Sequence, residues 1–503
     1  ISTHTFEIIE FDDRDQTDVI LGYEILPKLG IALTGVAHNF DDAVVFDDSI
    51  NDEVIPNNSP AGSIEDQKHF IEEIKPLLDA NQLIPKHSFC TVPESVIHLN
   101  TVEGEVVNIP QYPIPYKLRP KIQEQIEIWL ANGTIEKAPV NTKWNSPLTL
   151  AAKKDSQGNK SDTNKRVCLD TRALNNILLD DDVQSLPHIP DIFHKLAGYS
   201  VFTTFDAFSA FHRFEIFGPH RVKTSWTSPI DGTQYCFKGS PYGIKFLSNV
   251  YQRVMTRLFN DEYEYVDPSE NNGSTPRRRN PLKNHIAFFV DDLVCFSSDL
   301  TQHLIHVKEV IRILNKVNLI LNIDKCHFAQ KSINLLGFSV SAQGKTIDTR
   351  KISNIESWPR PKTGTDVQRF LGLVNYMRDH IPKASALMAP LDRIRNAKVI
   401  TEKEWTPIME THFQAIKKVL VSNIVLSPPD LNHPYTVYTD SSSYGIGCVL
   451  CQEYNVEKVD SDKSALQPSS TPPINNDNQS KLINIGINTK PPVKKIVKYI
   501  GFM

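Results

Sequence analysis

Cysteines are few in this sequence, and long apolar runs are absent. Seven cysteines are scattered over 503 residues at spacings that do not suggest a disulfide framework, so we expect a reducing compartment. No apolar stretch approaches the roughly 20 residues of a membrane span, and the start of the chain lacks a secretory signal pattern. We therefore expect no membrane partner. Because the chain begins with Ile1, we also expect a fragment or a processed piece.

Charge is distributed unevenly along the chain. Residues 1–110 contain 5 basic and 21 acidic residues, whereas residues 111–400 contain 39 basic and 28 acidic residues. The central part is therefore cationic and suited to a polyanion, although a mildly basic surface without a partner has the same composition. At roughly 100–200 residues per domain, the length predicts three or four structural units.

Two adjacent aspartates interrupt an apolar stretch in HIAFFVDDLVCFSSDL, at Asp291 and Asp292. The flanking residues can pair as a β-hairpin with both carboxylates at its tip. An exposed turn is one interpretation, because aspartate is common in turns. The apolar strand VFTTFD also ends in an aspartate, Asp206. Three carboxylates at strand ends can hold hard divalent cations, which favours a metal site for phosphoryl transfer.

Periodicity predicts further elements. A helix is expected from Ile64 to Asp79, and INLLGFSVS (333–341) reads as one strand. The segment 365–381 carries a helical apolar stripe, and Thr365 and Gln368 have the spacing of a capping box. The acidic, polar residues 36–65 are typical of a linker.

Together, these segments resemble the reverse transcriptase of gypsy-type LTR retrotransposons. The resemblance covers roughly residues 105–452 and rests on the order of several motifs. These are FTTFDAFSAFHRFEI, YCFKGSPYGIKFLSNVYQRVMTRLF, FFVDDLVCFSSD, LNIDKCHFAQKSINLLGFSVSAQGKTID and WPRPKTGTDVQRFLGLVNYMRDHIP. It implies an α/β fold: a right-hand polymerase with fingers, a ferredoxin-like palm and a thumb, plus a truncated ribonuclease H-like end.

The resemblance also implies roles for individual residues. Asp206, Asp291 and Asp292 match the catalytic triad that binds Mg²⁺ or Mn²⁺. Phe211 matches an aromatic gate that excludes a ribose 2′-hydroxyl, although a core phenylalanine is the alternative. Lys325 matches a lysine that could protonate departing pyrophosphate, although it could instead be structural. Leu336 and Gly337 match the turn that grips the primer end. The residues that match those holding the incoming nucleotide are Lys153, its neighbour Lys154, Arg166, Pro241, Tyr242 and Gly243.

The two ends resemble pieces of neighbouring polyprotein domains. DVILGYEILPKLGI resembles the end of a retropepsin-like protease, but no Asp-Thr/Ser-Gly triplet occurs, so we expect no protease activity. YTVYTDSSSYGIGCVL resembles the first hairpin of ribonuclease H, with Asp440 as a metal ligand; one such carboxylate alone predicts no ribonuclease H activity. The expected division is a protease remnant (1–35), an acidic linker (36–104), fingers and palm (105–345), a thumb (346–425) and a truncated ribonuclease H-like domain (430–503) with a polar insertion (455–490).

The resemblance predicts an RNA-directed DNA polymerase that adds deoxynucleoside triphosphates (dNTPs) to a primer 3′-hydroxyl by a two-metal mechanism. Expected partners are the RNA or DNA template-primer and further polyprotein domains, namely protease, ribonuclease H and integrase. A cytoplasmic particle and the nucleus are both compatible locations. The alternative is an inactive, nucleic-acid-binding remnant of a decayed or truncated element.

Overall fold

The computed structural model describes the chain from residue 59 onward, with gaps. The described ranges are 59–154, 160–179, 185–259, 282, 284–422, 424–427, 429, 433–442, 445–455 and 495–502, with backbone alone at 152–154, 160–164, 440–442, 445–447, 453–455 and 495–502. The predicted protease remnant (1–35) and residues 456–490 of the polar insertion lie outside these ranges. In the described part of the chain, no helix combines the length and the apolar character needed to cross a bilayer.

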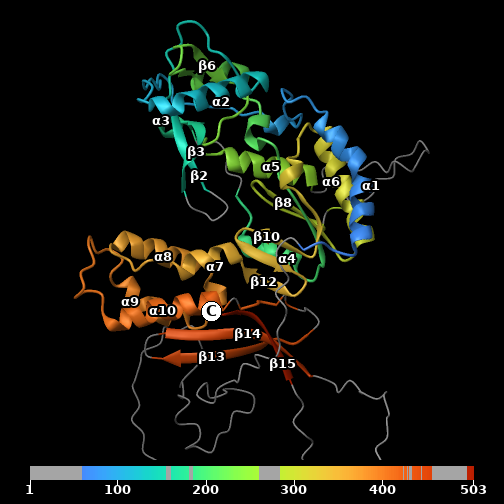
Figure 1. Cartoon of the computed structure of the whole chain (residues 1–503), viewed down its shortest axis with the longest axis vertical. Coiled ribbons are helices and arrows are strands. Elements are labelled where there is room, and N and C mark those ends of the chain that lie inside the picture. Colours follow the sequence, from blue (N-terminus) through green and yellow to red (C-terminus); the bar gives the residue numbers. More distant parts are fainter. Residues whose placement is uncertain are drawn as a thin grey trace, which may run out of the picture.

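A four-stranded antiparallel sheet lies at the centre of the molecule (Figure 1). Its strand order is β7-β8-β4-β9, with bounds Ile286–Phe289, Asp292–Ser297, Val201–Phe205 and His327–Gln330. Side chains alternate between two cores: Phe205 and Leu293 pack on one side, and Phe202 and Val294 on the other. Because both faces of β4 and β8 are buried, most of the residues in these strands are apolar.

Helices cover both faces of this sheet. On one side are α5 (Leu247–Phe259) and α6 (Leu300–Lys316), whose apolar residues join the largest core. On the other side is α4 (Ile189–Leu196), which contributes Ile192 and Leu196 to a smaller core. The sheet is therefore held rigidly between two helical layers, and its strand ends present their polar residues at one edge.

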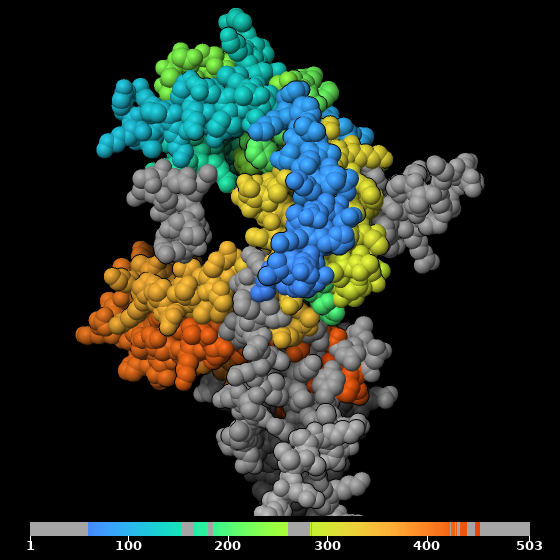
Figure 2. Space-filling model, turned by 45° about the vertical axis from the view of Figure 1, so that its right-hand side comes forward, coloured from blue at the N-terminus to red at the C-terminus, as the bar shows by residue number. Residues whose placement is uncertain are grey.

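The N-terminal helix α1 (Ile64–Gln82) corrects the predicted division of the chain. Residues 59–104 were assigned to an acidic linker, but α1 packs along α6, as the adjacent blue and yellow segments in Figure 2 show. Phe70 and Ile74 are buried, and the side-chain amide of Asn81 donates to the Asn315 amide oxygen at 2.6 Å. The acidic residues cover the exposed face of a docked helix, a pattern that composition alone does not distinguish from a linker.

The fingers lie at the top of Figure 1 and contain α2, α3 and two small antiparallel sheets. Helix α2 (Arg119–Ala131) ends before Gly133, whose φ of 62° is the left-handed conformation that stops a helix. A three-stranded sheet has the order β1-β6-β5, and the hairpin β2–β3 leads into α3. Their bounds are β1 Ile135–Lys137, β2 Leu148–Lys154, β3 Lys160–Leu169, α3 Arg172–Ile177, β5 Trp226–Thr227 and β6 Gln234–Phe237.

The predicted single strand 333–341 is a hairpin. Strands β10 (Ser332–Leu335) and β11 (Phe338–Ser341) pair antiparallel around Leu336 and Gly337, and β12 (Gly344–Ile347) completes the sheet. Both turn residues have positive φ, 49° at Leu336 and 84° at Gly337. The prediction was wrong because the apolar residues continue through the turn, so hydrophobicity alone does not mark it.

Four helices with their own core form the thumb, below the palm in Figure 1. They are α7 (Thr349–Glu356), α8 (Gly364–Tyr376), α9 (Ala384–Asp392) and α10 (Pro407–Val421). The capping box of α8 is formed by Thr363 and Asp366 instead of the predicted Thr365 and Gln368. Asp366 accepts from the Thr363 backbone N–H, so a carboxylate takes the role that we expected of an amide.

A three-stranded antiparallel sheet, in the order β13-β14-β15, follows the thumb. The predicted strand pair around 434–452 is present as β13 (Thr436–Ser442) and β14 (Gly445–Asn455). Strand β15 (Lys495–Phe502) pairs with β14.

Candidate active site

The two adjacent aspartates lie at a tight turn. Strands β7 and β8 pair up to Phe289 and Asp292, which leaves Val290 and Asp291 as a two-residue hairpin loop. Val290 has a φ of 51°, a conformation that a β-branched residue rarely adopts. Such strain costs about 1–3 kcal/mol and persists only where surrounding contacts enforce it.

Gln252 of α5 supplies those contacts. Its side-chain oxygen accepts from the Val290 backbone N–H at 3.1 Å, and its amide nitrogen donates to the Phe288 carbonyl at 3.4 Å. The side chain is buried, with 3 % of its surface exposed. The helix therefore holds the turn that presents Asp291, and sequence inspection did not single out this glutamine. A polar residue beside the apolar stripe of α5 was the available signal.

Strand register brings the third aspartate to the same place. Phe205 of β4 pairs with Leu293 of β8 in antiparallel register. One residue further along, Asp206 therefore comes opposite Asp292. All three carboxylates, Asp206, Asp291 and Asp292, line one cleft of about 450 Å³. We call it the aspartate cleft.

The carboxylates influence one another's ionisation. The pKa of Asp291 is raised to about 6, chiefly because the cleft walls shield it from water, and also because Asp292 and Asp206 repel its charge. The pKa of Asp292 is raised by the same shielding and by Asp206. Lys325, in a short 3₁₀ helix (Ile323–Lys325), lies 3.8 Å from the Asp206 carboxylate. This ammonium partly offsets the concentrated negative charge.

The donor chemistry of this edge suits a divalent cation. Within the described ranges, no group of three or more His, Cys, Asp or Glu side chains is gathered as ligands of one metal ion. The Asp206 carboxylate faces Lys325, so joint coordination with Asp291 and Asp292 requires it to leave that ammonium. Oxygen ligands and mutual repulsion are what a hard cation such as Mg²⁺ would satisfy and relieve.

A second cleft of about 440 Å³ extends from the aspartates toward the fingers, and we call it the nucleotide cleft. Its lining includes five residues singled out in the sequence: Arg166, Tyr242, Lys325, Asp206 and Asp291. The Arg166 guanidinium lies over the Tyr242 ring, 5.4 Å from its centre. Cationic and acidic groups therefore face each other across a space of nucleotide size.

Phe211 lies beneath this cleft and is not among its lining residues. Its ring packs edge-on against Tyr242 at 5.4 Å and against Tyr251 at 5.6 Å, with 8 % of its surface exposed. It can therefore act on the cleft through the position of Tyr242. The neighbouring Gly243 has a φ of 101°, and its carbonyl accepts from the Thr171 hydroxyl at 2.8 Å. Pro241 precedes Tyr242 in the same anchored loop.

Three predicted site residues have side chains that the structure does not describe. Lys153 and Lys154 end β2, on the hairpin that also carries Arg166, and Asp440 lies in β13 opposite Gly447. Only their backbone placement is known, so their roles stay predictions.

The turn at Leu336 and Gly337 is anchored by the thumb. The Tyr376 hydroxyl donates to the Leu336 carbonyl at 2.6 Å, and the Lys351 ammonium lies 4.9 Å from the centre of the Tyr376 ring. A Cβ at Gly337 would collide with the Lys351 side chain. The positive φ therefore favours glycine at this turn, and any side chain there would displace the end of Lys351.

Comparison with known protein families identifies the class of protein to which this fold and site belong. Residues 153–340 match the family described as "Reverse transcriptase (RNA-dependent DNA polymerase)", and residues 405–461 match the "RNase H-like domain found in reverse transcriptase". The second match begins at residue 405, just before α10 and upstream of the predicted boundary at 430. The chain therefore carries a reverse transcriptase domain followed by a ribonuclease H-like segment.

Curated relatives narrow the class further. The Pol polyprotein of transposon gypsy from Drosophila melanogaster is 27 % identical over 474 residues, which cover 90 % of this chain and 42 % of the relative. The transposon Tf2-3 polyprotein of Schizosaccharomyces pombe is 28 % identical over 71 % of this chain and 24 % of its own length. This chain is similar to these transposon polyproteins, and it spans less than half of their length.

Solved structures agree on the fold. The foamy viral protease-reverse transcriptase in complex with double-stranded DNA matches with a TM-score of 0.62 and 21 % identity, over 78 % of this chain and 63 % of that one. The same viral protein with an RNA/DNA hybrid matches with a TM-score of 0.59 and 21 % identity, over 78 % of this chain and 49 % of that one. The right-hand α/β architecture is therefore confirmed.

Proposed function

We propose that this chain is an active RNA-directed DNA polymerase that adds dNTPs to a primer 3′-hydroxyl on an RNA or DNA template. The observation that carries the proposal is the convergence of Asp206, Asp291 and Asp292 in the aspartate cleft, where Asp206 and Asp291 also line the nucleotide cleft. One cleft leads toward the fingers and the other toward the thumb, so nucleotide and primer can approach from opposite sides. Figure 2 shows the hollow between the fingers (cyan to green) and the thumb (orange).

Each cleft residue has a physical role in this proposal. Arg166, held over Tyr242, offers a forked donor to the triphosphate. Asp206, Asp291 and Asp292 would hold Mg²⁺ or Mn²⁺, which would lower the pKa of the primer hydroxyl and stabilise the triphosphate charge. Lys325 is placed to donate a proton to departing pyrophosphate once Asp206 no longer engages its ammonium. Lys153 and Lys154 would add charge at the triphosphate.

Phe211 is proposed to exclude ribonucleotides by holding Tyr242 up against the sugar position. A Phe211→Val variant then accepts ribonucleotides better, and we expect the ratio of kcat/KM for ribonucleotide over deoxynucleotide to rise about 10–200-fold. Single-nucleotide incorporation measures this ratio. A variant that loses stability but keeps its selectivity would show that Phe211 is only a core residue.

The rival is a folded but inactive nucleic-acid-binding remnant. A primer-extension assay on homopolymer RNA separates the two. We expect extension by the wild type and none by Asp291→Asn. The matched control is Asp299→Asn at the far end of β8, where the side chain caps α6 and asparagine caps equally well. Equal extension by wild type and Asp291→Asn, or extension by neither, would contradict the polymerase proposal.

The relatives are polyproteins, and the solved structures contain double-stranded DNA or an RNA/DNA hybrid. We propose the same kinds of nucleic acid as substrates here, and protease, ribonuclease H and integrase domains as partners. Contacts to the sugar-phosphate backbone should make binding strongly salt-dependent.

A further inference from the structure

Arg213 is a buried cation that no carboxylate accompanies. It ends the short 3₁₀ helix Ala210–Arg213, lines the nucleotide cleft and exposes only 3 % of its surface. Its Nη1 atom donates to the backbone carbonyls of Lys86 at 2.7 Å and of Ser88 at 2.8 Å. Within the described ranges, these are the only hydrogen bonds of the guanidinium, and no Asp or Glu forms an ion pair with it. Burial accordingly lowers the pKa of Arg213 to about 10.

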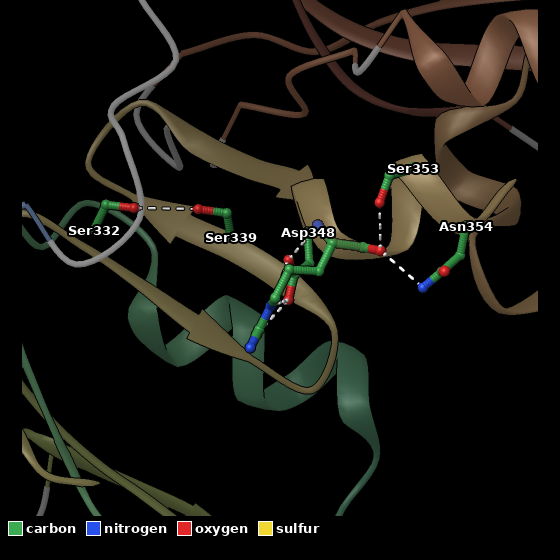
Figure 3. A network of polar contacts seen from close by, with 6 residues as sticks. Ser332, Ser339, Asp348, Ser353 and Asn354 are labelled. Carbon is green, nitrogen blue, oxygen red and sulfur yellow. Dashed lines mark hydrogen bonds and ion pairs between the residues drawn. The ribbon is translucent and has the colours of Figure 1, made fainter. Parts of the chain in front are cut away.

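Two arginines elsewhere in the chain are paired with aspartate. Arg350 and Arg172 each end an Asp-Thr-Arg tripeptide, and each guanidinium donates to the aspartate of that tripeptide at 2.6 Å. Figure 3 shows Asp348, the partner of Arg350, at the start of α7. The side chains of Arg350 and Arg172 are 62 % and 84 % exposed, whereas Arg213 is buried. Of these three cations, the one that burial disfavours most is therefore the one without a carboxylate.

A second cation and an aromatic ring stand beside Arg213 in the nucleotide cleft. The centre of the Phe208 ring lies 5.9 Å from the Arg213 guanidinium and 5.7 Å from the Lys86 ammonium. Phe208 is half-buried, Lys86 is exposed, and all three residues line the cleft. We call Lys86, Phe208 and Arg213 the outer cluster. Among the described residues of this cleft, the only acidic ones are Asp206 and Asp291, so the outer cluster contributes two positive charges and no negative one.

Backbone hydrogen bonds hold the outer cluster close to the aspartates. The carbonyl of Asp206 accepts from the Asn322 N–H at 2.8 Å. Two residues further on, the Phe208 N–H donates to the Ile320 carbonyl, also at 2.8 Å. Lys325, which follows in the same segment, lies 3.8 Å from the Asp206 carboxylate. An anion that leaves the aspartates past Lys325 would therefore meet the outer cluster next.

We propose that the outer cluster binds inorganic pyrophosphate after the new phosphodiester bond has formed. It is a subsite separate from Arg166 of the fingers hairpin, which we assigned to the triphosphate of the incoming nucleotide. The inference rests on the proposed polymerase function. Its consequence is that the product leaves the aspartates before it leaves the protein.

Pyrophosphate matches the outer cluster in charge and size. It is a compact polyanion without a base or a sugar, and it meets a guanidinium fork on Arg213 and a point charge on Lys86. Because Nη1 of Arg213 is already anchored, the guanidinium binds an anion with little further loss of side-chain entropy. The anion also supplies the negative charge that this buried cation lacks.

The chain contains a matched control for Lys86. The Lys238 ammonium lies 5.9 Å from the centre of the Phe89 ring, much as Lys86 lies over Phe208. Phe89 lines the nucleotide cleft, but Lys238 does not. A Lys238→Gln variant therefore removes a lysine from a phenylalanine ring beside the cleft without removing a cation from the cleft itself.

The first experiment titrates the full chain with pyrophosphate in Mg²⁺ by calorimetry. Nucleic acid is left out, so that no primer end is removed by the reverse reaction. We expect Lys86→Gln to weaken binding about tenfold, the loss typical of one charged hydrogen bond, and Lys238→Gln to bind like the wild type. Arg213→Gln should weaken binding at least as much, but this variant also loses the anchor of the backbone at Lys86 and Ser88. The test therefore depends on Lys86, whose side chain is exposed.

The second experiment separates product binding from nucleotide binding. Steady-state primer extension gives the inhibition constant for pyrophosphate and the KM for dNTP in each variant. We expect Lys86→Gln to raise the inhibition constant about tenfold and to change KM by less than about twofold. An equal rise in both constants would place Lys86 in the triphosphate site and overturn the proposal.

The titration can also refute the proposal. Unchanged pyrophosphate binding in Lys86→Gln, or an equal loss in Lys238→Gln, would do so, as would inorganic phosphate that binds as tightly as pyrophosphate. Pyrophosphate binding as expected, without primer extension by the wild type, would instead refute the polymerase function alone.

Discussion

Acid should weaken the attachment of α6 to the palm sheet through two buried histidines. The Thr203 hydroxyl accepts from the Ala329 N–H at 3.0 Å and lies 2.7 Å from Nε2 of His303. Ser297 lies 2.9 Å from Nδ1 of His303 and 2.8 Å from Nδ1 of His306. These contacts are satisfied when Thr203 donates to His303, His303 donates to Ser297 and Ser297 donates to His306. A further proton on Nε2 of His303 or Nδ1 of His306 would turn the facing hydroxyl proton away from its acceptor.

The sign and size of the effect follow from the pKa values. Burial, together with the neighbouring histidines, lowers the pKa of His303 to about 3 and that of His306 to about 4. Between these values and the unfolded value of about 6.5, the unfolded state binds more protons, so stability falls as pH falls. At pH 5.5 each histidine lowers the free energy of unfolding by about 1.4 kcal/mol relative to neutral pH, and the two together lower it by about 3 kcal/mol.

Hydrogen exchange of the α6 and β8 amides provides the assay, because it reports the free energy of opening at these two elements. The free energy of opening is compared at pH 7.5 and pH 5.5 in the wild type and in a His303→Gln/His306→Gln variant. We expect the wild type to lose about 3 kcal/mol more than the variant. His69→Gln, on the exposed face of α1, should behave like the wild type. Equal losses in the wild type and the double variant would refute the reasoning.

Three further predictions concern the catalytic edge. Gly337→Ala should destabilise the chain by about 1–3 kcal/mol in thermal unfolding, because alanine strains the positive φ and displaces the Lys351 side chain. Adding Lys351→Ala should recover only the stability lost through the contact with Lys351. Gln252→Leu should lower the stability of the chain by about 1–3 kcal/mol and reduce primer extension, because the Val290 N–H loses its acceptor. An unchanged melting temperature would contradict this prediction. Asp291→Asn should raise the melting temperature while abolishing extension, because it removes one charge from a repelling cluster.

Much of the catalytic edge could be predicted from the sequence. Asp206, Asp291 and Asp292 each follow or interrupt an apolar strand, and Asp206 comes opposite Asp292 in the observed register. Arg166 and Tyr242 were assigned to nucleotide binding from motif resemblance, and they line the same cleft. These residues were accessible because their signal is local: a charged or aromatic residue in a short pattern of fixed spacing.

Other features could not be predicted, because their partners are distant in sequence. Residues 59–104 were assigned to the linker, although a helix was expected from Ile64 to Asp79. Only the contact of α1 with α6 shows that this helix belongs to the core. Gln252 looks like an ordinary helix residue until it meets the Val290 turn, 38 positions later. Periodicity placed Leu336 and Gly337 within a single strand, and only the family resemblance marked a turn there; the reversal of the chain depends on their backbone angles.

The sequence by itself determined which strands are largely apolar and at which strand ends the aspartates lie. Both follow from side-chain alternation and turn preferences, which act over a few residues. Tertiary structure decided which side of those carboxylates faces the fingers and which faces the thumb. It also decided that Arg350, and not Arg172 in an identical tripeptide, stands at the aspartates. Two identical local motifs acquire different surroundings because packing of the thumb against the palm depends on contacts that no short stretch of sequence contains.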